Sequence, residues 1–195
     1  MDAWLEAVAA SPWLLLALFA LVVGDAFLVV LPSETLVVAA GALAASSGSP
    51  SPWLVIPIAA VGAVVGDAAC VGIGRAVGTD RWAWQRRGRI ASGIARARAL
   101  VDRRTATLVL TARYIPFARI AVNLSVGAAR IPWRRFLPLS ALAGTAWASY
   151  NVAIGALFGA VLATPWIAIV VSVPIAVLVG ASVDLALRRV ARVRD

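Results

Sequence analysis

The chain has 195 residues, of which 62% are hydrophobic and 14% are charged, and its formal net charge is +9. A soluble domain of this length has no interior large enough for that much apolar surface, so we expect an integral membrane protein. The chain has no histidine and one cysteine, which excludes an imidazole base, a histidine-ligated metal and an internal disulfide. All 18 basic residues are arginine, which also excludes lysine Schiff bases, and we expect no cofactor and no metal.

The first apolar segment, residues 13–45, contains a turn signal at Leu31-Pro32-Ser33. The arm that follows, residues 35–45, reaches about 16 Å as a helix, which is roughly half of the hydrocarbon core. A half-span must return to the side it came from, so we predict a re-entrant hairpin over residues 13–45, with arms at residues 13–30 and 34–45 and a break at Pro32. The alternative is that residues 13–31 cross completely and that only the second arm is re-entrant.

A surface loop and a full span follow this hairpin. Every residue from 46 to 52 is serine, glycine or proline, and these residues disfavour helix. Residues 53–74 are then long and apolar enough to form one transmembrane helix.

Residues 75–104 form a strongly basic segment, with nine arginines and only two aspartates. Apolar residues recur in it at helical spacing, and arginines share another face. The apolar positions are Ile90, Ile94, Ala97 and Val101, and the basic ones are Arg89, Arg96 and Arg103. We predict an amphipathic helix on the inner leaflet, where the arginines from Arg75 to Arg104 attract anionic headgroups. Nucleic-acid binding fits less well, because the segment is held between membrane helices.

A second broken apolar segment covers residues 105–129 and is interrupted at Pro116. Arginines flank it on both sides, at Arg103 and Arg104 before it and at Arg130, Arg134 and Arg135 after it. Because the positive-inside rule places both ends on the cytoplasmic face, we predict a second re-entrant hairpin over residues 105–129. One span separates the two hairpins, so they enter from opposite sides, which is the inverted-repeat plan of many secondary transporters.

The rest of the chain predicts two more spans. The 48 residues after Arg135 are uncharged, and residues 163–165 carry the turn signal near their middle. We expect spans at residues 136–160 and 166–187 and a cytoplasmic tail at residues 188–195. The predicted fold is an all-α membrane protein with two opposed re-entrant helical hairpins, about three full transmembrane helices and a basic amphipathic cytoplasmic helix.

Five ionisable residues lie inside the apolar segments: Asp25, Glu34, Asp67, Arg113 and Arg119. Each would cost about 2.5–3.5 kcal/mol at the centre of a membrane helix on insertion scales, so we expect the five to face one another. Three acids against two arginines leave one carboxylate without a fixed partner, which suits proton coupling. Two guanidinium groups also match the geometry of a phosphate. The alternative is that the five residues only pair and hold the hairpins together.

The same residues carry a resemblance to the DedA family, also called the SNARE-associated or VTT-domain family. Three motifs follow in the family's order, and the third is the most specific. They are Asp25 with Leu31-Pro32-Ser33-Glu34 and Ala40-Gly41, then Gly62 to Asp67 with Gly74-Arg75 and Gly78, then Arg113 to Arg119 with Gly127 and Pro132 to Phe136. The sequence departs from the family at Val29-Val30, Val71 and Val126, where the family often has two prolines, a tyrosine and an alanine.

The resemblance implies a single DedA-like domain over residues 1–195 that crosses the inner membrane of a bacterium several times. It implies a lipid translocase that moves undecaprenyl phosphate or a phospholipid between leaflets, often with the proton motive force. By position, proton coupling falls to Asp25, Glu34 and Asp67, and binding of the lipid phosphate falls to Arg113 and Arg119. The expected partners are membrane lipids and no nucleic acid, and a homo-oligomer is left open.

Three other functions remain open. A small-solute or drug/proton exporter of the same fold would hold a cation with the acids and use the arginines as their partners. A structural or assembly protein would need the charges only as pairs that apolar residues can replace together. An intramembrane enzyme is the weakest alternative, because Ser33-Glu34 and Asp67 are the only candidate nucleophile and acid and no suitable base accompanies them.

Overall fold

The computed structural model describes residues 11–28, 33–79, 85, 87–113 and 115–161. Within these ranges the chain forms helices and no strand, as the sequence predicts. The helices are α2 (Pro12–Asp25), α3 (Ser33–Ser47), α4 (Pro52–Val77), α5 (Gly88–Arg103), α6 (Thr105–Ala112), α7 (Pro116–Ala128) and α8 (Trp133–Val161). The predicted span at residues 166–187, the tail at 188–195 and the predicted break at Pro32 lie outside the described residues.

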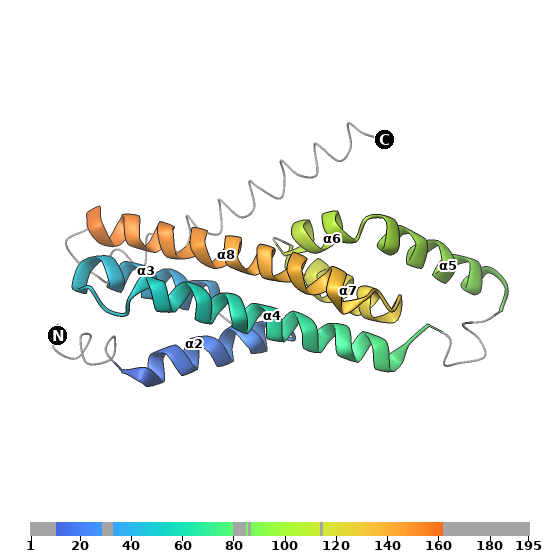
Figure 1. Cartoon of the computed structure of the whole chain (residues 1–195), viewed down its shortest axis with the longest axis horizontal. Coiled ribbons are helices and arrows are strands. Elements are labelled where there is room, and N and C mark those ends of the chain that lie inside the picture. The colour runs from blue at the N-terminus through green and yellow to red at the C-terminus, as the bar shows by residue number, and fades with distance from the viewer. Residues whose placement is uncertain (1–10, 29–32, 80–84, 86, 114, 162–195) are drawn as a thin grey trace, which may run out of the picture.

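Helices α4 and α8 are the two long elements of the described chain. Both are long and apolar enough to cross a membrane, over Pro52–Val77 and Trp133–Gly159. At 1.5 Å per residue they measure about 39 and 44 Å, which exceeds the hydrocarbon core of roughly 30 Å. They run side by side in opposite directions through the length of the molecule (Figure 1). Each extends by about one turn beyond the span expected from the sequence.

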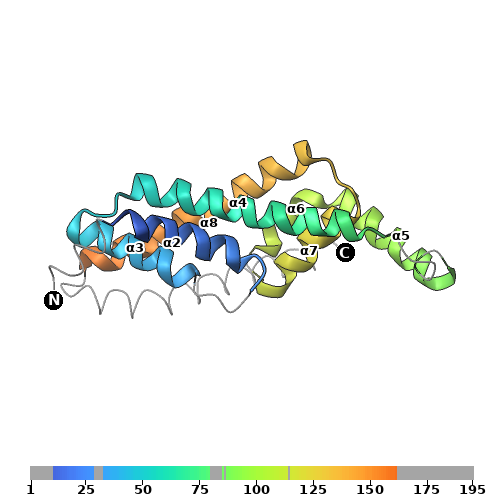
Figure 2. The same ribbon diagram turned by 90° about the horizontal axis from the view of Figure 1, so that it is seen from below.

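Two pairs of short helices enter from opposite ends of this long frame (Figures 1 and 2). The first hairpin, α2 and α3, starts and finishes at the end where α4 begins. The second hairpin, α6 and α7, starts and finishes at the end where α4 stops. The end of α2 and the start of α3 therefore face the end of α6 and the start of α7 near the middle (Figures 1 and 2). Their depth in a membrane stays a prediction.

The arms of the hairpins pack in a crossed pattern. Each first arm contacts the long helix that follows it in the chain, α2 on α4 and α6 on α8. Each second arm contacts the long helix that follows the other hairpin, α3 on α8 and α7 on α4. The two halves of the described chain thus have equivalent connectivity.

The first hairpin departs from the expected boundaries. Its first arm ends at Asp25 and not at Val30, because the N–H groups of Ala26 and Phe27 bond to carbonyls three residues back, at Val23 and Gly24, and tighten the last turn. Its second arm continues to Ser47. The Ser47 hydroxyl donates to the carbonyl of Leu43, so a serine expected in the loop is accommodated in the last helical turn.

Glycines allow the second arms to approach the long helices closely. A Cβ atom at Gly155 of α8 would meet the carbonyl of Val38 in α3, and one at Gly127 of α7 would meet the carbonyl of Val71 in α4. Because glycine has no Cβ, helix backbones touch at both places. The position of each hairpin along its long helix is therefore set by backbone contact.

Two apolar clusters form the core, one on each side of Asp67. The first joins α2, α3, α4 and α8 through residues that include Leu18, Val37, Val55, Ala63 and Trp147. The second joins α4 to helices α5 through α8 with residues that include Val71, Val101, Val109, Val126 and Phe136. Along α4, Ala63 and Val71 each lie about one helical turn from Asp67. A polar layer therefore separates the two clusters.

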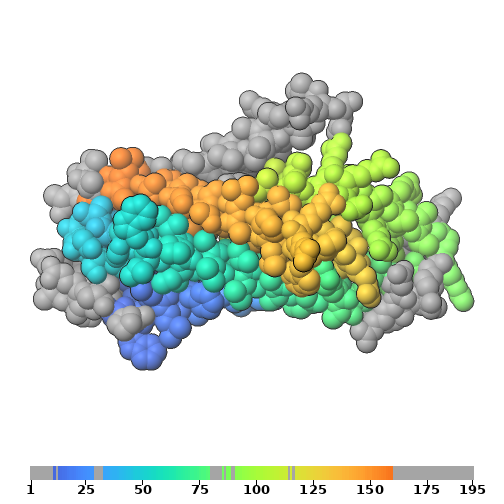
Figure 3. All heavy atoms as spheres, in the orientation of Figure 1, coloured from blue at the N-terminus to red at the C-terminus, as the bar shows by residue number. Residues whose placement is uncertain are grey.

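The surface of the bundle remains apolar. Trp13, Trp53 and Phe117 are 73%, 85% and 76% exposed, and large aliphatic residues of α2, α4 and α8 are exposed as well. Figure 3 shows α4 and α8 lying together across one face, with α2 below them. An exposed apolar surface of this extent is what a lipid solvent favours.

The predicted amphipathic segment contains helix α5. Val101 of α5 is buried in the second cluster and Ile94 is half-buried, whereas Arg96 and Arg103 are exposed. The side chains of Arg89 and Ile90 lie outside the described ones. The helix sits at the end of the molecule where α4 stops (Figures 1 and 2).

Candidate functional site

Asp67 is the centre of a buried polar network. It lies in the second half of α4, and its side chain is only 4% exposed. Oδ2 accepts hydrogen bonds from Arg113 Nη1 at 2.9 Å and from the Ser140 hydroxyl at 2.8 Å. Oδ1 accepts one from Asn123 Nδ2 at 2.9 Å and lies 3.5 Å from Arg119 Nε. Four donors from α8 and both parts of the second hairpin thus surround one carboxylate.

Arg119 connects the two hairpins. Its Nη1 lies 3.1 Å from Oδ2 of Asp25, the last residue of α2, while its Nε faces Asp67. The side chains of Arg119 and Asp25 are 11% and 17% exposed, against 2% for Arg113. The pair between the hairpins is thus the most open of the three ion pairs in this network.

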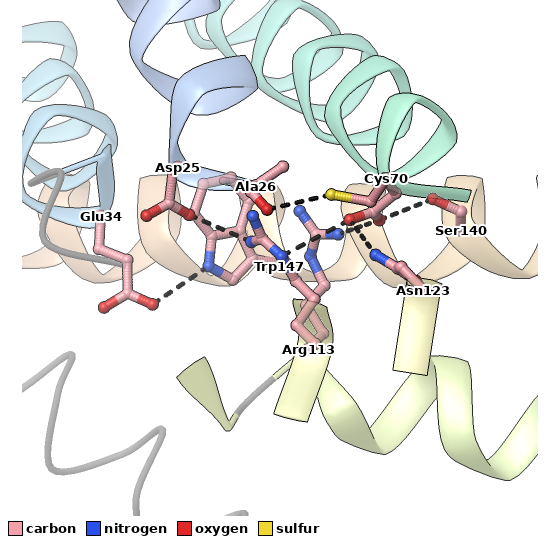
Figure 4. Close-up of polar contacts among 10 residues, drawn as sticks. Asp25, Ala26, Glu34, Cys70, Arg113, Asn123, Ser140 and Trp147 are labelled. Atoms are coloured by element: carbon pink, nitrogen blue, oxygen red, sulfur yellow. Dashed lines mark hydrogen bonds and ion pairs between the residues drawn. The ribbon is translucent and has the colours of Figure 1, made fainter. Parts of the chain in front are cut away.

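Glu34 is in a different environment. It is the second residue of α3, it is exposed, and its Oε1 lies 3.5 Å from Trp147 Nε1. Among the described residues no arginine lies within ion-pair distance of it. The Arg113 guanidinium lies 5.1 Å from the centre of the same Trp147 ring, so one indole separates Glu34 from Arg113 (Figure 4).

The two arginines retain donors that no acceptor satisfies. Nε and Nη2 of Arg113 and Nη2 of Arg119 are buried, and none of the three has a hydrogen-bond partner among the described residues. Leaving a buried charged donor unsatisfied costs more than the roughly 1–3 kcal/mol of a neutral group. Three such N–H-bearing atoms on two neighbouring guanidinium groups form an arrangement that can accept an anion with several oxygen atoms.

The ends of the hairpin helices contribute to the electrostatic field at this site. Arg113 is the C-cap of α6, where a cation complements the negative end of the helix dipole. Ile115 precedes α7 and provides no side-chain cap, and Pro116 is the first residue of that helix. Glu34 lies in the first turn of α3, where an anion is favoured. Glu34 and Arg113 thus agree with the helix dipoles, whereas Asp25 at the C-terminal end of α2 and Arg119 in the first turn of α7 oppose them and depend on their ion pairs.

The structure brings together four of the five ionisable residues singled out in the sequence, since Asp25, Asp67, Arg113 and Arg119 form one set of ion pairs. Glu34 joins this set only through the Trp147 ring.

Sequence reasoning missed Asn123, Ser140 and Trp147. Asn123 is the only amide in the apolar run of α7, and Trp147 is the one tryptophan far from a predicted interface, so both had a signal. Ser140 had none, because serine is frequent in the apolar segments of this chain. In the described part of the chain, acids and cysteine do not gather in groups of three that could hold a metal ion.

Comparisons with known proteins identify the family that the chain resembles. Residues 31–157 match the VTT domain. The chain is also 32% identical over 127 residues to inner membrane protein YohD of Escherichia coli (strain K12), a match that covers 65% of this chain and 65% of that protein. It thus spans just under two thirds of that relative's length. No solved structure matches the chain. The matched range includes Glu34, Asp67, Arg113 and Arg119, whereas Asp25 precedes it.

Proposed function

The chain belongs to the VTT-domain (DedA) family of membrane proteins, and from that premise we propose that it moves a lipid with a phosphate headgroup between leaflets of a bacterial inner membrane. Undecaprenyl phosphate and phospholipids are the candidate substrates. Transport is coupled to protons, and no covalent step is involved.

The observation that carries the proposal is the set of unsatisfied donors on Arg113 and Arg119. A phosphate presents several oxygen atoms, and guanidinium groups bind such oxygens in pairs. Asp67 holds Arg113 through Nη1 alone, which leaves Nε and Nη2 for the ligand. The uncapped N-terminus of α7 supplies further backbone N–H groups at the same level.

A headgroup reaches the two arginines only when the hairpin turns separate, because both guanidinium groups are enclosed. The pair between Arg119 and Asp25 is the natural place to open, since it is the most exposed contact of the network. In the proposed cycle the phosphate replaces Asp25 as the partner of Arg119. Asp67 keeps its four donors throughout and holds the second hairpin on α4.

Proton coupling falls to Glu34 together with Asp25. The carboxylate of Asp67 is held by four donors and serves to fix the second hairpin on α4, which leaves the other two acids for coupling. Glu34 is exposed and lacks an arginine partner within the described chain. The sequence predicted that three acids take part in proton coupling, and this proposal keeps two of them.

The charge distribution supports an inner-membrane topology with opposed re-entrant hairpins. Apart from Arg113 and Arg119, every described arginine lies on the last turn of α4, on α5 or its flanks, or between α7 and the start of α8. All of these positions are at the end where α4 stops (Figure 1). By the positive-inside rule this end faces the cytoplasm.

The test uses full-length protein in vesicles of phosphatidylcholine and phosphatidylglycerol that contain a fluorescent phosphatidylglycerol. A membrane-impermeant reductant bleaches the outer leaflet, and the rate of further bleaching reports exchange between leaflets. We expect Arg113→Lys and Glu34→Gln each to lower this rate by at least about tenfold, which corresponds to ~1.4 kcal/mol of barrier. Arg113→Lys keeps a cation beside Asp67 but removes the free donors.

Arg134→Gln is the matched control, because Arg134 is exposed and lies outside the network. Its exchange rate should equal that of the wild type. Equal rates in Arg113→Lys, Glu34→Gln and the control, at equal amounts of inserted protein, would remove the mechanism.

A second candidate function is export of a small cationic solute or drug in exchange for protons. The observation that favours it is the exposed carboxylate of Glu34 without an arginine partner among the described residues. It predicts that Glu34→Gln abolishes efflux of a cationic dye from the same vesicles while lipid exchange stays unchanged. The lipid proposal predicts the reverse.

A further inference from the structure

A second group of arginines lines a hollow at the end of α4, more than two helical turns beyond Asp67. The hollow has a volume of about 370 Å³ and is lined by Arg75, Arg98 and Arg130 together with residues 76–79 and Ala128. A neighbouring hollow of about 420 Å³ shares Arg98 and Arg130 and continues towards Asp102. Three helices, α4, α5 and α7, thus deliver arginines to one depression.

Arg75 is held rigidly at the inner side of this hollow. Its Nη2 donates to the carbonyl of Ile131, and its guanidinium lies 4.5 Å from the centre of the Trp133 ring. Its Nε is buried and has no hydrogen-bond partner within the described residues. Arg75 therefore places a fixed cation in the wall of a space large enough for a ligand.

Arg98 and Arg130 supply the exposed outer cations. Both are exposed, and no carboxylate of the described residues lies within ion-pair distance of either. The nearest acid of the depression, Asp102, is already engaged, since Arg135 Nη1 lies 3.0 Å from its Oδ1 and Arg135 Nη2 donates to its carbonyl at 2.7 Å. Within the described part of the chain, no ion pair therefore neutralises the charge of these two arginines.

Arg130 has a backbone conformation that normally selects glycine. Its φ is +58°, and it terminates α7 in a Schellman motif, with Arg130 N–H bonded to Gly127 and Ile131 N–H bonded to Val126. Arginine is strained in this left-handed region, whereas glycine is not. A side chain kept at such a position at the expense of stability points to a use for that side chain.

From these observations we propose that the hollow binds a phosphate group, as a monoester or diester. The C-terminal ends of α4 and α7 oppose an anion with about half a charge each, but three arginines outweigh them. The phosphate source is a lipid headgroup of the leaflet at this end or a soluble phosphate compound. The site is separate from the Asp67 network, and the proposal does not depend on transport.

The test measures binding of short-chain phosphatidic acid, glycerol phosphate and inorganic phosphate to full-length protein in an uncharged detergent. We expect Arg98→Gln with Arg130→Gln to weaken binding by about fivefold for each arginine removed, which corresponds to ~1 kcal/mol per arginine. Binding of phosphatidic acid alone identifies a lipid headgroup as the source. Equal binding of glycerol phosphate identifies a soluble compound.

The control is the double variant Arg103→Gln with Arg134→Gln, which removes the same amount of positive charge. Both of these arginines are exposed and lie outside the hollow. Arg130→Gly separates binding from folding, because it should lower affinity about fivefold while the melting temperature stays equal or rises. Equal loss of binding in the control pair would show attraction by surface charge alone and overturn the site. Unchanged affinity in Arg130→Gly, or no binding of any probe by the wild type, would also overturn it.

Discussion

The two hairpins are built alike and carry opposite charges. In each of them a second arm crosses to the long helix of the other half and touches its backbone at glycines, Gly155 for α3 and Gly127 for α7. The first hairpin brings acids to its turn, and the second brings arginines. The hairpins also differ in how deeply these charges are buried: the Arg113 side chain is 2% exposed and bound to Asp67, whereas Glu34 is exposed.

This difference separates two uses of charge within one site. The second hairpin is fixed to α4 and α8 by a buried carboxylate with four donors. The first hairpin is held by the first apolar cluster, by glycine contacts and by one ion pair, Asp25 with Arg119, that is partly open. The first hairpin is therefore the half that we expect to move, and its acids are the ones that we expect to change partners.

The largest effect should come from Asp67. Asp67→Ala leaves Arg113 buried without its partner, and breaking a buried pair in this way costs about 3–5 kcal/mol. The free energy of unfolding in mixed micelles titrated with sodium dodecyl sulfate measures the loss. Asp67→Asn keeps the shape of the side chain and one of its two oxygen acceptors, so it should lower the free energy of unfolding by less. A loss below about 1 kcal/mol in Asp67→Ala would contradict the central role of this carboxylate.

Glycine contacts should matter equally in both hairpins. Gly155→Ala and Gly127→Ala each place a methyl group against a backbone carbonyl, of Val38 and Val71 respectively, and should destabilise by about 1–3 kcal/mol. Gly72→Ala, in the same helix as Val71, is the control, because nothing lies within 4 Å of the added carbon. It should stabilise by about 0.5–1 kcal/mol. A large loss in only one hairpin would show that the two halves pack differently.

Asp25→Asn should have a smaller effect. It removes the charge that holds Arg119 to the first hairpin, while Arg119 Nε keeps its contact with Asp67. We expect a loss of about 1 kcal/mol, between the values for exposed and fully buried pairs. The same titration measures it. A loss as large as that of Asp67→Ala would mean that the first hairpin is fixed as firmly as the second.

Glu34→Gln should change stability least, by less than about 0.5 kcal/mol, because Glu34 is exposed and has a single long contact with Trp147. Glutamine keeps an oxygen acceptor for that contact. Lipid exchange should nevertheless fall in this variant. Circular dichroism melting measures the stability of the variant, and the vesicle assay measures lipid exchange with the same protein preparation. Strong destabilisation would place Glu34 among the structural charges and end its role in coupling.

Sequence patterns predicted the helical class and the position of the long helices, because charge-free runs bounded by arginine leave few alternatives in a membrane. They placed the end of α2 five residues too late, because the signal at Pro32 does not report the hydrogen bonds that close the helix at Asp25. The crossing of α3 onto α8 could not be predicted, since it depends on backbone contact between residues far apart in sequence.

For the site, the cost of charge in a membrane was enough to select Asp25, Glu34, Asp67, Arg113 and Arg119 as one group, and the structure joins all of them except Glu34 in ion pairs. Counting charges also predicted one carboxylate without a fixed arginine, but not which one. That answer depends on burial, which leaves Glu34 outside the set of ion pairs.

The position of Asp67 has a consequence for biosynthesis. Helix α4 leaves the ribosome with Asp67 when its nearest cationic partner, Arg113, is still 46 residues away in the nascent chain. The translocon must therefore insert a helix with an unpaired aspartate, at a cost of about 2.5–3.5 kcal/mol near the bilayer centre. The remaining apolar residues of α4 offset that cost until the second hairpin arrives. Ser140 completes the set last, so the polar layer closes only after much of α8 has been synthesised.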